Sequence, residues 1–409
     1  MTDAHSAIEA VARQSYSRLV SFLAARFRDV TSAEDALSEA ILAALRTWPT
    51  QGVPSNPQAW LLQAAKHRLI DRMRHTRVRD AGAQAMRALL DEAEELSLTT
   101  HFPDERLKLL FVCAHPAIDS RIHTPLMLQT VLGLDVEAIA AAFLVPAPTM
   151  SQRLARAKTK IRDTRIAFEV PAGKDLSTRL SAVLEAIYAT YTRGWDDFDG
   201  VDNDKSELTD EALWLARMTV ELLPDEPEAI GLLALLLFCE ARRDARRGAS
   251  GEYVPISEQD VSKWNRAQII EAQSLLSRAS KFDRAGRFQL EAAIQSAHAE
   301  RLRDNAIDWM AIALLYEGVV RIAPTFGAML GRAAAVAEAY GPEQGIQLLD
   351  TLASDDAAPT HQSYWATRGF LLQRLRRTAE ATAAFRAAIA LTNDPSVRAF
   401  LTHALRPSE

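Results

Sequence analysis

The chain has only two cysteines among its 409 residues, Cys113 and Cys239. Two cysteines cannot build a disulfide framework, and residues 1–10 are polar and carry no apolar signal core. We therefore expect reduced thiols in a cytoplasmic protein. Glycine (16) and proline (17) are also scarce, while alanine, leucine, arginine and glutamate dominate. This composition is typical of a helical protein.

Long apolar runs and strand patterns are missing as well. The most apolar stretch, residues 229–239, is far too short to cross a bilayer and is closely followed by charges, so we expect a core helix there. No segment alternates β-branched residues with a period of two, which argues against sheets. A chain of 409 residues is too long to fold around a single hydrophobic core, so we predict two to three domains. The expected fold class is all-α.

Motifs for enzymatic chemistry are also lacking, since the sequence has no phosphate loop and no dinucleotide fingerprint. One group, Cys113, His115, Asp119 and His123, has the residue types of a metal site or a nucleophile. Its Cys-x-His-Pro spacing matches no common zinc pattern, and Pro116 would break a helix that carried these residues. We therefore predict a structural role for the group, no metal, no cofactor and no enzymatic activity.

Positive charge is concentrated in two tracts, although the formal net charge of the chain is -6. Residues 66–79 hold six lysines and arginines against one acid, and residues 153–165 hold another six against one. Acids gather in residues 91–95 and 196–210. The two basic tracts predict confined contacts with a polyanion, or else solvated helix faces. Residues 242–247, with four arginines, we interpret as a solvated turn.

A helix-turn-helix is predicted around the second basic tract. Residues 135–144 carry apolar side chains at helical spacing: Val136, Ile139, Ala140 and Phe143. Residues 145–148 form a turn, and Thr149 can start or cap the next helix. One face of that helix is apolar: Met150, Leu154, Ala157 and Ile161. The basic and polar remainder of residues 149–160 predicts a recognition helix for the major groove. The alternative is an exposed amphipathic helix in a bundle.

The first 77 residues predict three helices. The first spans residues 8–27, and the second is capped by Thr31 or Ser32 and ends near Arg46. Residues 48–57 form a stiff, non-helical loop that includes Trp48-Pro49. The third helix starts near Pro57. Its apolar face holds Leu61, Leu62, Ala65, Leu69 and Met73. We expect Trp48 and Trp60 to pack in the core rather than to stack on bases.

These segments resemble extracytoplasmic-function sigma factors. Residues 149–158 (TMSQRLARAK) resemble their -35-reading helix, and residues 33–36 (AEDA) with Glu39 resemble the segment that docks on the clamp helices of RNA polymerase. Residues 48–74 resemble the stretch that melts and reads the -10 element. The resemblance covers about 40% of the chain. Ser38 and His67 depart from the usual Gln and Asn, which leaves the promoter sequence open.

The resemblance implies three sets of contact residues. The -35 element would be contacted by Thr149, Gln152, Arg153, Arg156, Lys158 and Lys160. The -10 element would be contacted by Gln63, Lys66, His67, Arg68, Asp71 and Arg74. Core RNA polymerase would be bound by Asp35, Ser38 and Glu39.

The rest of the chain narrows the resemblance. Residues 103–117, 224–234 and 289–294 resemble the subgroup with a long C-terminal repeat extension, although Cys113-Ala114 stands where that subgroup often has a Cys pair. Trp365, Gly369, Leu372, Ala381, Phe385 and Ala388 match the spacing of a tetratricopeptide repeat. Stacked helix pairs would form a solenoid with a protein-binding face; the alternative is a helical bundle without a binding role.

The expected organisation is therefore a first sigma domain (1–77), a linker (78–103), a helix-turn-helix domain (104–170) and a tetratricopeptide-like extension (175–409). The expected function is that of an alternative sigma factor with a regulatory extension. Its partners would be core RNA polymerase, promoter DNA and a protein or intramolecular contact of the repeats, but no membrane. The alternative is a helix-turn-helix regulator with a protein-binding scaffold that is not a polymerase subunit.

Overall fold

The structure is a computed structural model that describes residues 2–77, 104–143, 145–196, 203–248, 251–304, 306–355, 357–392 and 394–405. Within these ranges it contains helices and no strand, which confirms the all-α fold class. The predicted linker, 78–103, and the acids at 91–95 lie outside the described residues. None of the described helices is both long and apolar enough to cross a membrane. The chain divides into two compact units, residues 1–190 and 191–409.

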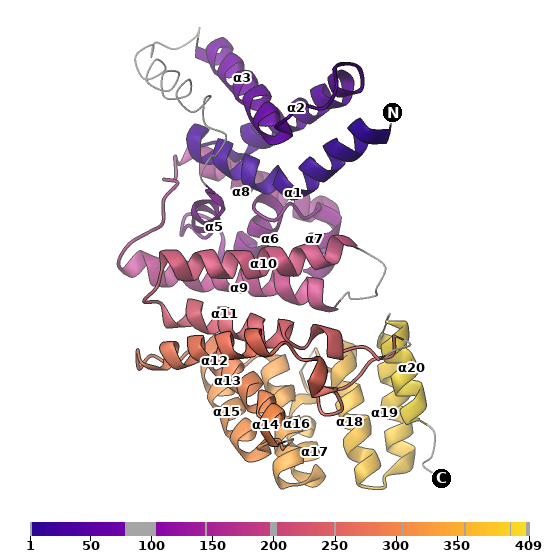
Figure 1. Cartoon of the computed structure of the whole chain (residues 1–409). Coiled ribbons are helices and arrows are strands. Elements are labelled where there is room, and N and C mark those ends of the chain that lie inside the picture. Colours follow the sequence, from indigo (N-terminus) through magenta and orange to yellow (C-terminus); the bar gives the residue numbers. More distant parts are fainter. Residues whose placement is uncertain are drawn as a thin grey trace. The chain divides into compact units, whose positions relative to one another are not determined.

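The first unit begins with three helices that pack on one another, α1 (Thr2–Phe27), α2 (Val30–Gln51) and α3 (Pro57–Arg77) (Figure 1). The side chains at their shared core are fully buried leucines: Leu19, Leu23, Leu37, Leu61 and Leu69. Asp29 caps α2, because its carboxylate accepts from the Ser32 amide at 3.1 Å and from the Ser32 hydroxyl at 2.8 Å. The prediction that Thr31 or Ser32 caps this helix is wrong; a carboxylate three residues upstream of Ser32 takes that role.

Helix α2 continues through Trp48-Pro49 to Gln51, so the prediction that the loop starts at Trp48 is wrong. A proline inside a helix removes a backbone bond, but here the extra turn buries Trp48 to 2% exposure. The Trp48 and Trp60 rings meet edge to face, with centroids 5.5 Å apart. The predicted core packing is confirmed for Trp48, whereas Trp60 is half-buried. Gly52, at φ +87°, ends the helix. The predicted start of α3 at Pro57 is confirmed.

The second block of the first unit contains α5 (Arg106–Cys113), α6 (Ser120–Thr130), α7 (Val136–Ala142) and α8 (Ala147–Asp163), and α9 (Lys174–Asp196) follows. Helix α5 is almost wholly buried. The Cys113 thiol lies 3.4 Å from the Thr130 hydroxyl, and burial raises the pKa of Cys113 to about 12.

The other three members of the Cys113 group also make local structural contacts. His115 accepts from the Ala117 amide, Asp119 caps α6, and a ring nitrogen of His123 lies 3.0 Å from the Ile118 carbonyl oxygen. These contacts agree with the structural role predicted for the group.

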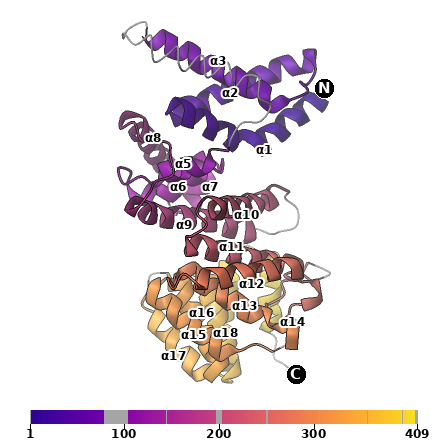
Figure 2. The same ribbon diagram turned by 60° about the vertical axis from the view of Figure 1, so that its left-hand side comes forward.

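The second unit is a succession of helices in which neighbours along the chain pack side by side, as Figure 2 shows for α12 to α18. It comprises α10 (Asn203–Leu222), α11 (Pro227–Glu240), α12 (Arg266–Ser280), α13 (Arg287–Ala299), α14 (Arg301–Asp304), α15 (Trp309–Ile322), α16 (Phe326–Tyr340), α17 (Pro342–Leu352), α18 (Gln362–Arg374), α19 (Thr378–Leu391) and α20 (Pro395–Ala404), with short 3-10 turns at Arg243–Ala245, Val261–Lys263 and Ala358–Thr360. The core helix expected at residues 229–239 is confirmed as α11.

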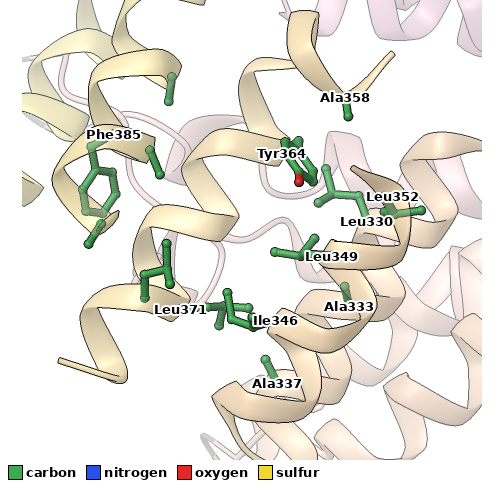
Figure 3. Close-up of a cluster of buried hydrophobic side chains, with 14 of the residues drawn as sticks. Leu330, Ala333, Ala337, Ile346, Leu349, Leu352, Ala358, Tyr364, Leu371 and Phe385 are labelled. Atoms are coloured by element: carbon green, nitrogen blue, oxygen red, sulfur yellow. The ribbon is translucent and has the colours of Figure 1, made fainter. Parts of the chain in front are cut away.

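Helices α18 and α19 form the pair that the tetratricopeptide-like spacing predicts. A Cβ atom on Gly369 would lie 2.7 Å from the Phe385 ring, so the glycine is what lets the two helices approach this closely. Leu372, Ala381, Phe385 and Ala388 are buried. Their cluster extends to leucines and alanines of α16 and α17 (Figure 3).

A long connection between α11 and α12 ties the last helix to an early part of the unit. We call its described residues, 241–248 and 251–265, the strap. Arg247 forms an ion pair with Asp394 at 2.7 Å, and the Ser396 hydroxyl donates to the Gly251 carbonyl at 2.9 Å. The Tyr253 and Phe400 rings meet edge to face at 5.4 Å. The strap therefore fastens α20 to the segment that follows α11.

The prediction of a solvated turn at residues 242–247 is wrong. Arg242 is buried and donates to the Gln295 side chain at 2.6 Å, Arg243 pairs with Glu240, and Arg247 pairs with Asp394. Gln295 and Asp394 lie far away in the sequence, so local charge alone could not reveal that these arginines hold the fold together.

Candidate nucleic-acid interface

Helices α7 and α8 are joined by a tight turn, and α8 has the predicted buried back. Met150, Leu154, Ala157 and Ile161 are all buried. Helix α8 begins at Ala147, so Thr149 lies in its first turn and does not cap it. The side chains on the opposite side are exposed: Gln152, Arg153, Arg156 and Lys160, with Thr149 half-buried. On α7, Ile139 and Ala140 are buried, whereas Phe143 is exposed.

A groove of about 450 Å³ runs beside the exposed face of α8. Arg153, Arg156 and Lys160 line one side, and Arg121 with Ile122 lines the other from the start of α6. Arg121 is 86% exposed and forms an ion pair with Asp119 at 2.6 Å. Hydrogen bonds from Arg121 lower the pKa of Asp119 to about 2. The groove is lined by four basic side chains and by the Asp119 carboxylate, and basic side chains of this kind hold phosphate groups.

Sequence reasoning missed Arg121 as a groove residue, because it lies outside the two basic tracts. Only the packing of α6 against α8 brings it to the groove.

Lys158 is placed differently from the other predicted -35 residues. Its side chain is only 10% exposed, and its ammonium donates to both carboxylate oxygens of Glu34 on α2, at 2.8 and 2.7 Å. Burial raises the pKa of Glu34, and the charge and hydrogen bonds of Lys158 oppose that shift. In this arrangement Lys158 faces α2 and not the groove.

Helices α2 and α3 bring the predicted polymerase-binding and -10 residues together. Arg68 lies 3.1 Å from Glu39, and Arg72 lies 3.3 Å from Asp35 and also pairs with Glu39. Asp35 and Ser38 are exposed. Arg72 was not among the predicted contact residues, although it falls within the first basic tract.

The remaining predicted -10 residues lie along α3. Gln63, His67 and Asp71 are exposed, and Lys66 and Arg68 are half-buried. The side chain of Arg74 lies outside the described side chains.

Helix α7 and helix α8, with its buried back and basic front, have the arrangement that a DNA-binding helix-turn-helix requires. Two family models match other parts of the chain. Residues 11–79 match the family model "Sigma-70 region 2", and residues 179–280 match a family of unknown function (DUF6596).

The chain is 37% identical over 380 residues to an uncharacterized protein of Rhizobium meliloti, which covers 92% of this chain and 89% of that protein. It is 31% identical over 148 residues to the ECF RNA polymerase sigma factor SigC of Mycobacterium tuberculosis and to a probable RNA polymerase sigma-C factor of Mycobacterium bovis. These matches cover 36% of this chain and 75% of each relative. No solved structure matches the chain. The chain belongs to the RNA polymerase sigma factor family.

Proposed function

We propose that the chain is an alternative sigma factor of the extracytoplasmic-function group, which directs bacterial RNA polymerase to specific promoters in the cytoplasm. The observation that carries this proposal is the basic groove beside α8, in a chain whose residues 11–79 match sigma region 2. The same match argues against the alternative, a helix-turn-helix regulator that is not a polymerase subunit. The polymerase performs RNA synthesis, so the chain itself is no enzyme.

In this proposal residues 104–170 read the -35 element. Helix α8 enters the major groove, where arginine bonds guanine with two hydrogen bonds and glutamine reads adenine. Gln152, Arg153 and Arg156 are exposed side chains of these types on α8, and the two arginines line the groove. Thr149 and Lys160 flank them. Arg121, across the groove from α8, would add a backbone phosphate contact.

Residues 1–77 would bind core polymerase and open the -10 element. Asp35, Ser38 and Glu39 present acidic and polar groups at the surface of α2, which suits a basic partner surface. The polar side of α3, with Gln63, Lys66, His67, Arg68, Asp71 and Arg74, would hold the melted strand. Basic and polar side chains serve this task because they bind phosphates and accept unstacked bases.

The test of the -35 assignment is runoff transcription with core polymerase on a promoter mapped upstream of the chain's own gene. Arg153→Ala and Arg156→Ala should each lower promoter binding roughly 5- to 150-fold, the equivalent of losing one base contact of roughly 1–3 kcal/mol. Arg162→Ala is the matched control, because Arg162 is exposed on α8 but pairs with Asp163 and does not line the groove. Unchanged transcription by both groove variants would refute the assignment of α8.

The polymerase contact is tested by replacing Asp35 and Glu39 together with arginine. The double variant should fail to retain core polymerase in a pull-down while keeping its helical circular dichroism, because both side chains lie at the surface of α2. Undiminished retention would remove this face from the proposal.

We also propose that the C-terminal extension, residues 175–409, regulates the sigma domains as a tetratricopeptide-like array. Residues 1–190 form a compact unit, so truncation after Thr190 keeps the residues of that unit, including α9 up to Thr190, and removes the rest of the extension. If the repeats contact polymerase, the truncated chain should transcribe less than the full chain; this is the outcome we expect. If the repeats instead cover the basic tracts, truncation should raise promoter binding, most at low salt. Equal transcription at matched folding would exclude both roles.

A further inference from the structure

Two buried arginines of the second unit lack an acidic partner. Arg242, at the start of the strap, is 9% exposed, and Arg301, on α14, is 8% exposed. Among the residues that the structure describes, neither guanidinium forms an ion pair. Arg242 donates to the side-chain oxygen of Gln295 at 2.6 Å. Arg301 donates to the backbone oxygens of Ile256 and Gln259. Two positive charges are therefore buried with neutral acceptors, although burying a charge is costly unless it is paired.

Another buried arginine shows what such a charge ordinarily receives. Arg106 is 7% exposed and pairs with Asp104 at 2.9 Å. The second unit has a carboxylate close by in the sequence, on Glu291, one helical turn before Gln295. That carboxylate already pairs with Arg287 at 2.7 Å. The protein thus supplies counter-charges to other arginines and leaves Arg242 and Arg301 without one.

The two guanidiniums act on the same imidazole, that of His298 on α13. Burial lowers the pKa of His298 to about 4, and the charges of Arg242 and Arg301 add to the shift. The ring is only 7% exposed, and no hydrogen bond reaches its Nδ1 from the described part of the chain. At neutral pH the ring is uncharged, so one of its nitrogens can donate a hydrogen bond. His298 therefore places an unused polar atom near both positive charges.

Two further unpartnered atoms belong to side chains that contact Arg301. Within the described ranges, Oε1 of Gln259 and Nε1 of Trp264 have no hydrogen-bond partner, and both side chains are buried. The Arg301 guanidinium lies over the Trp264 ring, 5.5 Å from its centroid, and donates to the Gln259 backbone oxygen at 3.1 Å. Leaving a buried polar atom unbonded costs free energy. Three such atoms beside two unpaired cations indicate a site for a negatively charged polar ligand.

We propose that Arg242, His298 and Arg301 bind a small divalent oxyanion of the phosphate type. Two guanidiniums without carboxylates match two negative charges, and the fork of N–H groups on arginine suits the oxygens of a phosphate. His298 and Trp264 add neutral donors, and Oε1 of Gln259 can accept from the hydroxyl of hydrogen phosphate. This inference goes beyond the proposed function, because the site lies in the extension and its occupancy requires neither polymerase nor DNA.

An anion held by both arginines would join separate parts of the second unit. Arg242 belongs to the strap, and Arg301 on α14 already holds two carbonyl oxygens of the strap. The same strap fastens α20 through the ion pair between Arg247 and Asp394. Bound phosphate would therefore stabilise the strap against opening and, with it, the attachment of α20. The extension would respond in this way to the concentration of a free oxyanion.

The test is hydrogen–deuterium exchange of the full-length chain, titrated with inorganic phosphate at mildly alkaline pH while sodium chloride keeps the ionic strength constant. At a phosphate concentration ten times its Kd, amides of the strap, α13 and α14 that exchange by opening of the site should exchange roughly tenfold more slowly. Amides of α2 lie in the other compact unit and should not change. Acetate at the same concentration should not reproduce the protection, because one negative charge leaves one guanidinium unpaired.

Gln295→Glu tests the site while keeping both arginines. The substitution preserves the shape and the acceptor of the 2.6 Å bond from Arg242, and it adds an internal carboxylate with which phosphate must compete. Phosphate affinity should fall by about tenfold or more, and the strap without phosphate should exchange more slowly than in the parent. Gln273→Glu adds the same charge at an exposed position of α12 and should keep the parent affinity.

Arg242→Met should abolish phosphate binding, but the loss of a buried arginine can unfold the unit, so the decisive variant is Gln295→Glu. The proposal is overturned if millimolar phosphate gives the parent chain no protection, or if acetate protects equally. It is also overturned if Gln295→Glu keeps the parent affinity, or if phosphate slows exchange alike in both units, as a general salt effect on stability would. These outcomes leave promoter recognition untouched, since transcription with core polymerase tests it separately.

Discussion

His298 on α13 should make the second unit sensitive to acid. The imidazole is only 7% exposed and packs edge to face against Trp309, with ring centroids 5.5 Å apart. Among the described residues, none hydrogen-bonds its Nδ1. Burial lowers the pKa of His298 to about 4 from an ordinary 6.5, and the nearby charges of Arg242 and Arg301 add to the shift. The folded unit therefore resists protonation of this ring.

The sign and size of the effect follow from the two pKa values. Above the ordinary pKa the ring is neutral in both the folded and the unfolded chain, so it costs no stability. As the pH falls through 6.5 towards 4 the unfolded chain takes up the proton first, and the free energy of unfolding decreases. At about pH 5 the loss is about 2 kcal/mol, and it approaches about 3 kcal/mol below pH 4.

The assay is hydrogen–deuterium exchange of the α13 and α15 amides at about pH 7.5 and about pH 5, corrected for intrinsic exchange rates. It reads the opening free energy of these helices alone, which matters because the chain has two compact units. His298→Gln removes the titrating group and should abolish most of the extra destabilisation at the lower pH. His403→Gln, at an exposed position on α20, should retain it. A His298→Gln protein with the full acid sensitivity of the parent would refute the argument.

Three other outcomes are expected. Cys113, whose pKa burial raises to about 12, should resist alkylation in the folded chain at about pH 8 and react once denatured; labelling of Cys113 under native conditions, read by mass spectrometry, would contradict this. Gly369→Val should destabilise α18 and α19 by roughly 1–3 kcal/mol in denaturant titrations, because its Cβ meets the Phe385 ring, whereas Gly327→Ala, which meets open space, should not. Arg247→Ala should lower the opening free energy of α20 by roughly 1–3 kcal/mol in hydrogen exchange, and an unaltered α20 would show that the strap is dispensable.

The sequence predicted those features that depend on neighbours along the chain. The buried and exposed sides of α8 follow from a helical period that Met150, Leu154 and Ile161 mark, and the start of α3 follows from Pro57. Pro49 misled the prediction, because a local rule for proline was overridden by the burial of Trp48. The burial of one tryptophan depends on a second helix, which a local rule does not see.

The sequence did not predict contacts between distant residues. In the sequence, Lys158 is one of six cations in a basic tract. Its ion-pair partner Glu34 lies 124 positions away, so the sequence does not indicate the pair. Arg121 was missed, and Arg242 was misread, for the same reason. In each case charge and spacing identify the type of side chain, but only the packing of helices decides whether it meets water, DNA or a carboxylate.

The strap gives the second unit a mechanical property that an open array of helix pairs does not have. Such arrays can stretch and bend along their length, because each repeat contacts only its neighbours. Here Arg247, Gly251 and Tyr253 hold α20, so tension applied at the C-terminus reaches the segment after α11 directly. The ion pair between Arg247 and Asp394 must break before the helix pairs between the strap and α20 can be pulled apart. A partner would therefore meet an array whose last helix is already held by the strap.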